Sequence, residues 1–359
     1  MSRPYTAVLI VPTGIGAAIG GYAGDALPVA RALAEVVDRL ITHPNVLNGA
    51  QLYWNLPNAL YVEGYGLDQF AAGRWGLRPV QQNRIGLILD QGIEPELQLR
   101  QLQAADAARA TLGLELTDYT VTDAPLQVSL KTAASGATWG TIENPDSLLR
   151  AAEKLIKQAG AQAIAVVARF PDDTATAAVQ QYRHGQGVDP LAGAEAVISH
   201  LIVRTFRVPC AHAPALAPLP IDPQLSPRSA AEELGYTFLP CVLVGLSRAP
   251  QWIDRFAAPL PASQPEDLWV NQVDAVVVPA TACGGSGLLS FGQARTGARQ
   301  PLIIAVRDNR TTMQVSPEAV GLRATSVNSY LEALGLLVLH RSGLRLDALN
   351  PTIEQIRQL

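Results

Sequence analysis

Short apolar segments recur along the chain, and each is followed at once by Gly, Pro, Asp or Asn. Their length and their content of Val and Ile are typical of buried strands. The predicted strands are Ala7–Val11, Ile85–Leu89, Ala163–Ala168, Cys241–Gly245, Ala275–Val278 and Leu302–Val306. Continuous apolar runs of this kind suit parallel strands that are covered on both faces. The pattern therefore predicts a mainly parallel sheet.

Stretches with helical spacing of apolar residues lie between these strands. The predicted helices are Ala26–Ile41, Glu94–Leu112, Asp146–Gln158, Gly193–Val203 and Pro227–Leu234. Asp25 is a good N-cap for the first of them, and Pro28 falls in its first turn, where proline is tolerated. Alternation of strand and helix predicts an α/β fold, with a mostly parallel sheet and helices on both faces.

The length of the chain bears on its division into domains. Its 359 residues exceed the roughly 100–200 of one typical domain, which favours either one large domain or two intimately packed subdomains. Residues 207–228 hold six prolines and are expected to form a surface connection. We therefore expect an N-terminal α/β part at 1–206 and a C-terminal α/β part at 229–359.

Composition and charge exclude several classes of protein. Hydrophobic residues make up 48% of the chain and charged residues 16%, against a usual charged share of about 25%, so a disordered chain is excluded. A net charge of −4 without a dense basic block disfavours nucleic acid as a partner. No window approaches the ~18 apolar residues of a spanning helix, and three cysteines do not make a disulfide framework. We expect a cytoplasmic protein without a membrane partner.

The first candidate site is the glycine-rich segment after the first predicted strand. Glycines let backbone N–H groups approach a ligand, and the start of a helix favours an anion. The expected ligand-binding residues are Thr13, Gly14, Gly16, Gly20 and Gly21. Their spacing departs from the dinucleotide fingerprint G-x-G-x-x-G, and no P-loop lysine is present. A tight strand-to-helix turn with close packing is the alternative.

The second candidate follows the predicted strand Ala275–Val278. Open α/β sheets bind ligands beyond the carboxyl ends of their strands, so Gly284, Gly285 and Ser286 are expected to bind one. Cys283 is a candidate nucleophile or acid–base thiol if its surroundings lower its pKa. The alternative is a small-residue loop with an inert cysteine.

Two further residues are candidates for proton transfer. His212 lies in a loop bounded by prolines, and a histidine titrates near neutrality. Together with Cys210 it supplies two metal ligands at best, so no metal site is predicted. Lys131 enters a small-residue loop in a chain with three lysines, and either a titratable amine or an ordinary exposed strand residue explains it. His200 is expected to be a helical residue bonded within the core.

The last candidate follows the predicted strand Leu302–Val306. Arg307 can clamp a carboxylate or phosphate, and Asn309 and Thr311 can orient it. A turn or helix-capping cluster explains the same residues equally well. Because loops after parallel strands share one edge of the sheet, we expect the loops at 13–25, 208–214, 280–287 and 307–312 to converge on one anion-binding cavity.

Several motifs carry a resemblance to a known family. They are Val11–Ala17, Gly20–Asp25, Gly187–Pro190, Glu195–His200 and Val208–Pro214. Together they resemble the DUF3326 family of cyanobacterial and plastid-lineage proteins, over roughly residues 5–345. The resemblance implies a photosynthetic lineage and a soluble housekeeping role. It supplies no catalytic residues.

Two classes of function fit these observations. The first is an enzyme that acts on a small anionic metabolite, a carboxylate or phosphate ester, by isomerase, lyase or transferase chemistry rather than redox. The second is a non-catalytic metabolite-binding or assembly protein in a photosynthetic organism. No motif names a cofactor. The low charged fraction and the apolar run at 334–339 favour a homo-oligomer.

Overall fold

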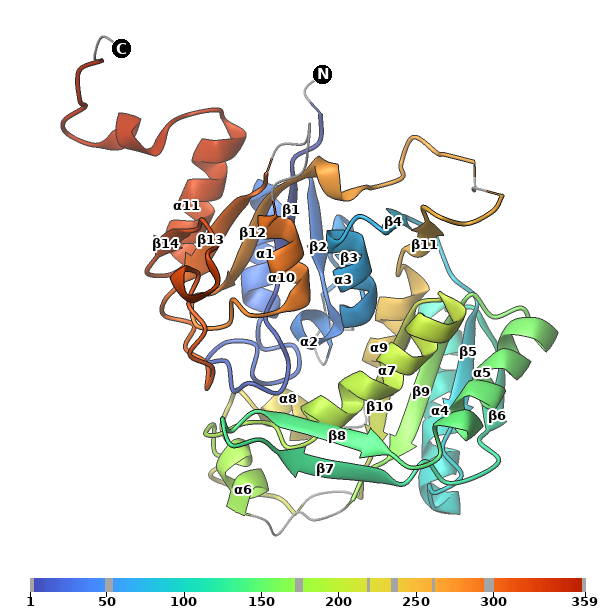
Figure 1. Ribbon diagram of the computed structural model, residues 1–359. Coiled ribbons are helices and arrows are strands. Elements are labelled where there is room, and N and C mark those ends of the chain that lie inside the picture. The colour runs from blue at the N-terminus through green and yellow to red at the C-terminus, as the bar shows by residue number, and fades with distance from the viewer. Residues whose placement is uncertain are drawn as a thin grey trace.

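The computed structural model describes residues 3–48, 54–171, 177–217, 220–233, 238–259, 262–293 and 300–356. Two parallel sheets form the body, and helices lie on both faces of each sheet (Figure 1). The predicted α/β class with mostly parallel strands is confirmed.

The larger sheet has six parallel strands. In spatial order they are β14 (Thr325–Val327), β13 (Leu302–Val306), β12 (Val273–Pro279), β1 (Thr6–Leu9), β2 (Arg39–Thr42) and β3 (Ala59–Tyr61). The helices around it are α1 (Leu27–Val36), α2 (Pro44–Leu47), α3 (Gly64–Ala71), α10 (Ser286–Gly292) and α11 (Tyr330–Arg341). Side chains of β1 alternate between the two faces. Leu9 packs in one buried cluster with Leu33 and Leu337, and Val8 packs in another with Phe70 and Phe291.

The smaller sheet has four parallel strands. In spatial order they are β10 (Cys210–Ala215), β9 (Ala163–Arg169), β5 (Ile85–Leu89) and β6 (Leu116–Val121). Its helices are α4 (Pro95–Leu112), α5 (Pro145–Gln158), α7 (Ala192–Phe206) and α9 (Phe238–Ser247). Leu89 packs in one cluster with Leu243 of α9, and Ile88 packs in another with Leu148 of α5 and Ile198 of α7.

The remaining elements are short. They are the antiparallel pair β4 (Trp75–Arg78) and β11 (Gln251–Asp254), the hairpin β7 (Val128–Thr132) and β8 (Thr138–Ile142), the helices α6 (Ala177–Arg183) and α8 (Ala230–Glu233), and the 3₁₀ turns Val270–Gln272, Glu318–Val320 and Leu346–Leu349. The hairpin packs on α7, where Gly193 faces the backbone of Thr138. It therefore reaches from the smaller sheet toward the loops of the larger one, since Thr138 N donates to Gly14 O (2.9 Å).

One buried cluster spans both sheets. It contains Leu9 and Leu33 from the larger half together with Leu89 and Leu243 from the smaller half. The strands of the larger sheet come from residues 6–61 and 273–327, and those of the smaller sheet from 85–215. The expected connection at 207–228 therefore does not fall between the two sheets.

Two predicted elements are wrong in type. The run Cys241–Gly245 is part of helix α9 and not a strand, because a short apolar run has the same appearance in a buried helix and in a buried strand. The predicted helix Ala26–Ile41 stops at Val36, and residues 39–42 form β2. Its last residues pair with β1 in the sheet, so tertiary pairing overrides the helical spacing.

The proline-rich stretch at 207–228 is also not a loop throughout, because it contains β10. Among the described strands, β10 pairs with β9 alone, at the edge of its sheet, so Pro214 removes no hydrogen bond from a second described neighbour. Of the predicted helix Pro227–Leu234, α8 covers Ala230–Glu233, and residue 234 lies outside the described residues. The other predicted strands and helices are confirmed, with bounds that differ by at most a few residues.

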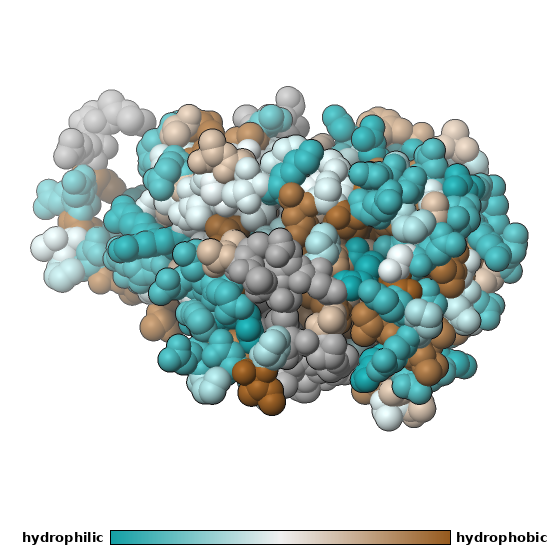
Figure 2. Space-filling model, turned by 90° about the horizontal axis from the view of Figure 1, so that it is seen from below, coloured by the Kyte–Doolittle hydropathy of each residue, from teal (hydrophilic) through white to brown (hydrophobic). Residues whose placement is uncertain are grey.

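The face of the molecule seen from below is largely polar (Figure 2). Figure 2 shows hydrophilic side chains over most of the face seen from below, with hydrophobic ones in smaller groups between them. The apolar run at 334–339 lies in α11, where Leu336 and Leu337 are buried and Val338 is 45% exposed. Among the described helices, none has both the length and the apolar character to cross a membrane.

Candidate functional site

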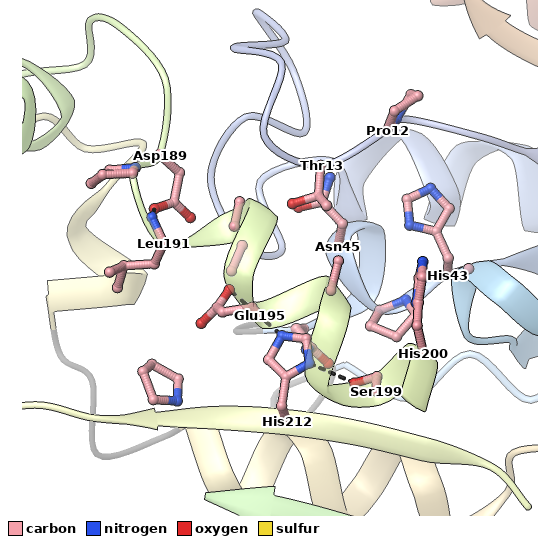
Figure 3. A pocket seen from close by; sticks show the side chains of 18 of the residues that line it. Pro12, Thr13, His43, Asn45, Asp189, Leu191, Glu195, Ser199, His200 and His212 are labelled. Atoms are coloured by element: carbon pink, nitrogen blue, oxygen red, sulfur yellow. Dashed lines mark hydrogen bonds and ion pairs between the residues drawn. The ribbon is translucent and has the colours of Figure 1, made fainter. Parts of the chain in front are cut away.

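A cavity of about 670 Å³ lies between the two sheets. The larger sheet contributes residues that follow the carboxyl ends of its strands: Thr13 after β1, His43 after β2, Glu63 after β3 and Gly285 after β12. From the smaller half, α7, the residues before it and strand β10 form the facing wall (Figure 3). The cavity thus occupies the edge where open α/β sheets bind their ligands.

His212 lies on β10 and is held by two side chains of α7. Its Nδ1 lies 2.6 Å from Ser199 Oγ, and its Nε2 lies 3.5 Å from Glu195 Oε2. Glu195 and Ser199 are four residues apart, so one face of the helix presents both of them (Figure 3). All three residues line the cavity. The arrangement fixes the imidazole ring between a hydroxyl and a carboxylate.

Asp189 stands just before α7 and also lines the cavity. Its Oδ1 accepts a hydrogen bond from the backbone N–H of Leu191 (2.8 Å). Burial, reinforced by the neighbouring charge of Glu195, raises the pKa of Asp189 to about 7. A carboxyl with this pKa both holds and releases a proton near neutral pH.

A second histidine–carboxylate pair crosses the cavity between α7 and the start of α3. His200 Nδ1 is paired with Glu63, which is 4% exposed and also accepts the backbone N–H of Gly66 (3.1 Å). Burial opposes a charge on His200, but the carboxylates of Glu63 and Asp68 outweigh it and raise the pKa of this histidine. His200 is half-exposed at the cavity and paired with a buried carboxylate, so it is not the core-bonded helical histidine expected from the sequence.

His43 is a buried histidine on the side of the larger sheet. Its Nε2 accepts the backbone N–H of Val11 (2.9 Å), and burial lowers its pKa to about 4. The ring is therefore neutral at pH 7, with its proton on Nδ1. Within the described part of the chain Nδ1 has no partner, and His43 lines the cavity (Figure 3).

Four of the residues expected from the sequence line this cavity: Thr13, Gly285, Ser286 and His212. They come from three of the four loops expected to converge. Ser286 Oγ donates to Asp68, whose pKa is raised by burial. Gly285 has open space where a Cβ would stand.

The four glycines expected from the sequence in this loop, Gly14, Gly16, Gly20 and Gly21, do not line the cavity. Gly14 and Gly16 have positive φ angles of 70° and 58° and pack against Thr138 and Thr312. Gly20 N donates to Asp25 (2.5 Å), and Gly21 O accepts the Tyr182 hydroxyl (3.1 Å). The N–H of Gly20 is therefore used within the chain, by Asp25.

The loop at 307–312 is tied to the first loop outside the cavity. Asn309 is buried, accepts from Ile19 N (2.9 Å) and donates to Ile19 O (2.8 Å). Thr311 Oγ1 lies 2.8 Å from Thr281 Oγ1, and Arg307 is exposed. The alternative of a structural turn cluster describes these residues better than a clamp.

Two catalytic candidates also lie outside the cavity lining. Cys283 is fully buried among apolar side chains, and burial raises the pKa of its thiol to about 11, so the thiolate is scarce at neutral pH. Lys131 is exposed on β7, with its Nζ 4.6 Å from the ring centre of Trp139. Gly284, next to Cys283, packs near Val315. We therefore give none of these residues a place in the site.

Most of the titratable residues that line the cavity were not predicted from the sequence. They include His43, Glu63, Asp68, Asp189 and Glu195, and Ser199 was missed as well. One local signal was present: Ala192, Glu195, Ala196, Ser199 and His200 recur at helical spacing on α7 and make a polar stripe flanked by small residues. Over the described residues, no group of three His, Cys, Asp or Glu side chains is arranged to hold a metal ion.

Fold and cavity together define a two-sheet α/β protein with a titratable site at the carboxyl edge of its larger sheet. The chain belongs to the family described as "Protein of unknown function (DUF3326)", whose model matches residues 6–350, so the resemblance seen in the motifs is confirmed. It is 60% identical over 351 residues to a protein of Synechococcus sp. named "Uncharacterized lipoprotein", covering 98% of this chain and 95% of that protein. No solved structure matches it significantly.

The name of this relative corrects one expectation. It calls that protein a lipoprotein, which points to a membrane-anchored location, so the cytoplasmic location expected from the sequence is wrong. A lipid is attached covalently and needs no apolar run of spanning length. The lack of such a run therefore did not exclude an anchored protein.

Proposed function

We propose that this protein is an enzyme that performs acid–base chemistry on a small molecule bound in the cavity between the sheets. The observation that carries the proposal is His212, held by Glu195 and Ser199, in the same cavity wall as Asp189. Catalytic acids and bases often have pKa values that their surroundings move toward the working pH. Here a carboxyl with a pKa raised to about 7 lines the same cavity as a histidine that is held by a carboxylate.

In this proposal His212 is the general base and Asp189 the general acid. Glu195 orients the imidazole and stabilises its charged form, as the third member of such constellations does. Isomerase, lyase and transferase reactions all need proton transfers of this kind. They suit the site better than hydride transfer, because the glycine loop lacks the dinucleotide fingerprint.

The charged side chains that line the cavity indicate the charge of the substrate. Four carboxyl groups line the cavity, those of Glu63, Asp68, Asp189 and Glu195, and Arg183 is the one Lys or Arg among its described lining residues. The guanidinium of Arg183 donates to Pro220 O (2.7 Å). The anionic ligand suggested by the glycine loops finds little support here, so we propose a substrate without a strong negative charge.

A thermal-shift screen of a metabolite collection tests the proposal, because a ligand of the native state raises the melting temperature. Each ligand found is then incubated with the protein in D₂O and analysed by mass spectrometry for turnover or deuterium incorporation. We expect His212→Gln to lose about a hundredfold or more in rate and to keep its affinity for the ligand. His184→Gln is the matched control, since His184 lies outside the cavity and pairs with Asp222.

A ligand that shifts the melting temperature without turnover or exchange would instead indicate a non-catalytic binding protein, the second class considered from the sequence. If His184→Gln and His212→Gln react at the same rate, the assignment of the base is refuted.

We also propose a homo-oligomer, because α11 exposes Leu331 (79%) and Val338 (45%) although its inner face is buried. Light scattering at micromolar concentration tests it, and a mass of a single chain would exclude it.

A further inference from the structure

Ser199 is the residue of the cavity that acid–base chemistry alone does not explain. Its hydroxyl lies 2.6 Å from Nδ1 of His212, which is within hydrogen-bond reach of a nucleophile and its base. Ser199 is only 3% exposed, and it lines the cavity. In Figure 3 the dashed contacts run from Ser199 to His212 and on to Glu195.

The carboxylate of Glu195 indicates which ring nitrogen of His212 donates and which accepts. A carboxylate only accepts, so the tautomer of His212 that satisfies both neighbours has its proton on Nε2, which faces Glu195. Nδ1 is then the unprotonated nitrogen and accepts the hydrogen bond of the Ser199 hydroxyl. The separation of 3.5 Å at Glu195 is long for a hydrogen bond, as such contacts often are before a substrate is bound.

We infer that Ser199 is a nucleophile served by His212 and Glu195, and that the cavity transfers or hydrolyses a short, uncharged acyl ester. This inference rests on the proposed function and specifies its reaction class. The order of groups matches the logic of a serine–histidine–acid constellation, with the two ring nitrogens exchanged.

The chemistry balances with water as the second reactant. Ser199 Oγ forms a bond to the carbonyl carbon of the ester while its proton moves to His212 Nδ1. The bond to the leaving alkoxide breaks, and the alkoxide takes that proton from Nδ1. Water then attacks the acyl-serine, its proton passes to Nδ1, and the serine oxygen leaves with this proton as the acid product is released.

The walls of the cavity indicate the class of ester. Leu130, Leu191 and Leu216 line it next to the polar stripe of α7, so a short apolar acyl chain has apolar neighbours. The carboxylates named above disfavour a negatively charged acyl group. On the opposite wall, the neutral His43 offers an N–H donor without a partner among the described residues.

Labelling with a fluorophosphonate tests the nucleophile without knowledge of the natural substrate. We expect an adduct on Ser199, formed with loss of fluoride and located by peptide mass spectrometry. Ser199→Ala is expected to abolish it, and His212→Gln to slow it by about a hundredfold or more. Ser247→Ala is the matched control, because Ser247 is a buried helical serine outside the cavity lining, and its hydroxyl donates to Val244 O (2.7 Å).

A second variant guards against a folding defect in Ser199→Ala. Glu195→Gln keeps the size of the side chain and is expected to slow labelling by about tenfold or more at an unchanged melting temperature. With p-nitrophenyl butyrate, the wild-type protein is expected to release a burst of about one nitrophenolate per chain.

An absent adduct, or one that persists in Ser199→Ala, overturns the inference. If deuterium exchange of a screened ligand still depends on His212 in that case, the proposed acid–base function stands without a nucleophilic serine. If neither is found, both fail.

Discussion

Asp189 gives the sharpest test of the electrostatics of the cavity. Its carboxyl titrates at about 7 in the folded chain, against an ordinary value of 3.8. The folded state thus binds this proton more tightly than the unfolded state. The stability that this group contributes is complete below the ordinary pKa and is lost as the pH rises through the raised one.

The size of the effect follows from the two pKa values. Between about pH 5 and about pH 8, the folded chain loses roughly 2 to 3 kcal/mol of unfolding free energy through this one carboxyl. Replacing Asp189 by Asn removes the titration. The amide oxygen of Asn still accepts the N–H of Leu191, so the start of α7 keeps its hydrogen bond. We expect the unfolding free energy of the wild type to fall from pH 5 to pH 8 by this amount more than that of Asp189→Asn.

Urea unfolding followed by circular dichroism over this pH range measures the difference. The control is Asp118→Asn, because Asp118 is exposed on β6 and its replacement is expected to leave the profile parallel to that of the wild type. If the profiles of Asp189→Asn and the wild type are also parallel to within about 0.5 kcal/mol, the carboxyl does not titrate in the raised range and its role as a proton donor is refuted.

Three further outcomes are expected. Cys283 should not react with Ellman's reagent in the native protein at pH 7.4, since its thiol is buried and has a pKa of about 11; rapid labelling before unfolding would contradict this. Gly193→Ala should lower the unfolding free energy by about 3 kcal/mol or more in urea unfolding, because the new Cβ would stand 2.3 Å from the carbonyl oxygen of Thr138. Gly285→Ala is the control: its Cβ would meet open space, and the loss should be under about 1 kcal/mol. Asn309→Leu should cost about 2–4 kcal/mol by leaving the backbone of Ile19 unpaired, and a smaller loss would mean that the two loops do not depend on this amide.

Strands and helices were predictable where one local pattern decides them. The strands Ile85–Leu89 and Leu302–Val306 have the predicted bounds, because a run buried on both faces is apolar throughout and ends where polar residues begin. Cys241–Gly245 was not predictable, since α9 is buried on nearly every side and loses its helical periodicity. The strands β2 and β3 have four and three residues, too few to show a period.

The residues of the candidate site were also predictable only where local sequence patterns place them. The loops after β1 and β12 were predicted at the cavity, because parallel strands of one sheet end at the same edge. His212 was singled out for its chemistry, but its partners Glu195 and Ser199 lie on a helix that meets β10 only through packing. His43 and Glu63 were missed because their positions follow from the short strands β2 and β3.

The sequence alone predicted the α/β class, the family, the main strands and helices, and the edge of the sheet at which the cavity lies. These follow from local periodicity and from the direction of parallel strands. Only the tertiary structure decided that the glycine loops bond to other parts of the chain and that Cys283 is buried. It also decided that α7 sets Glu195 and Ser199 against His212. The physical reason is that burial and partnership depend on segments far apart in the chain, and these properties set the pKa and reactivity of a side chain.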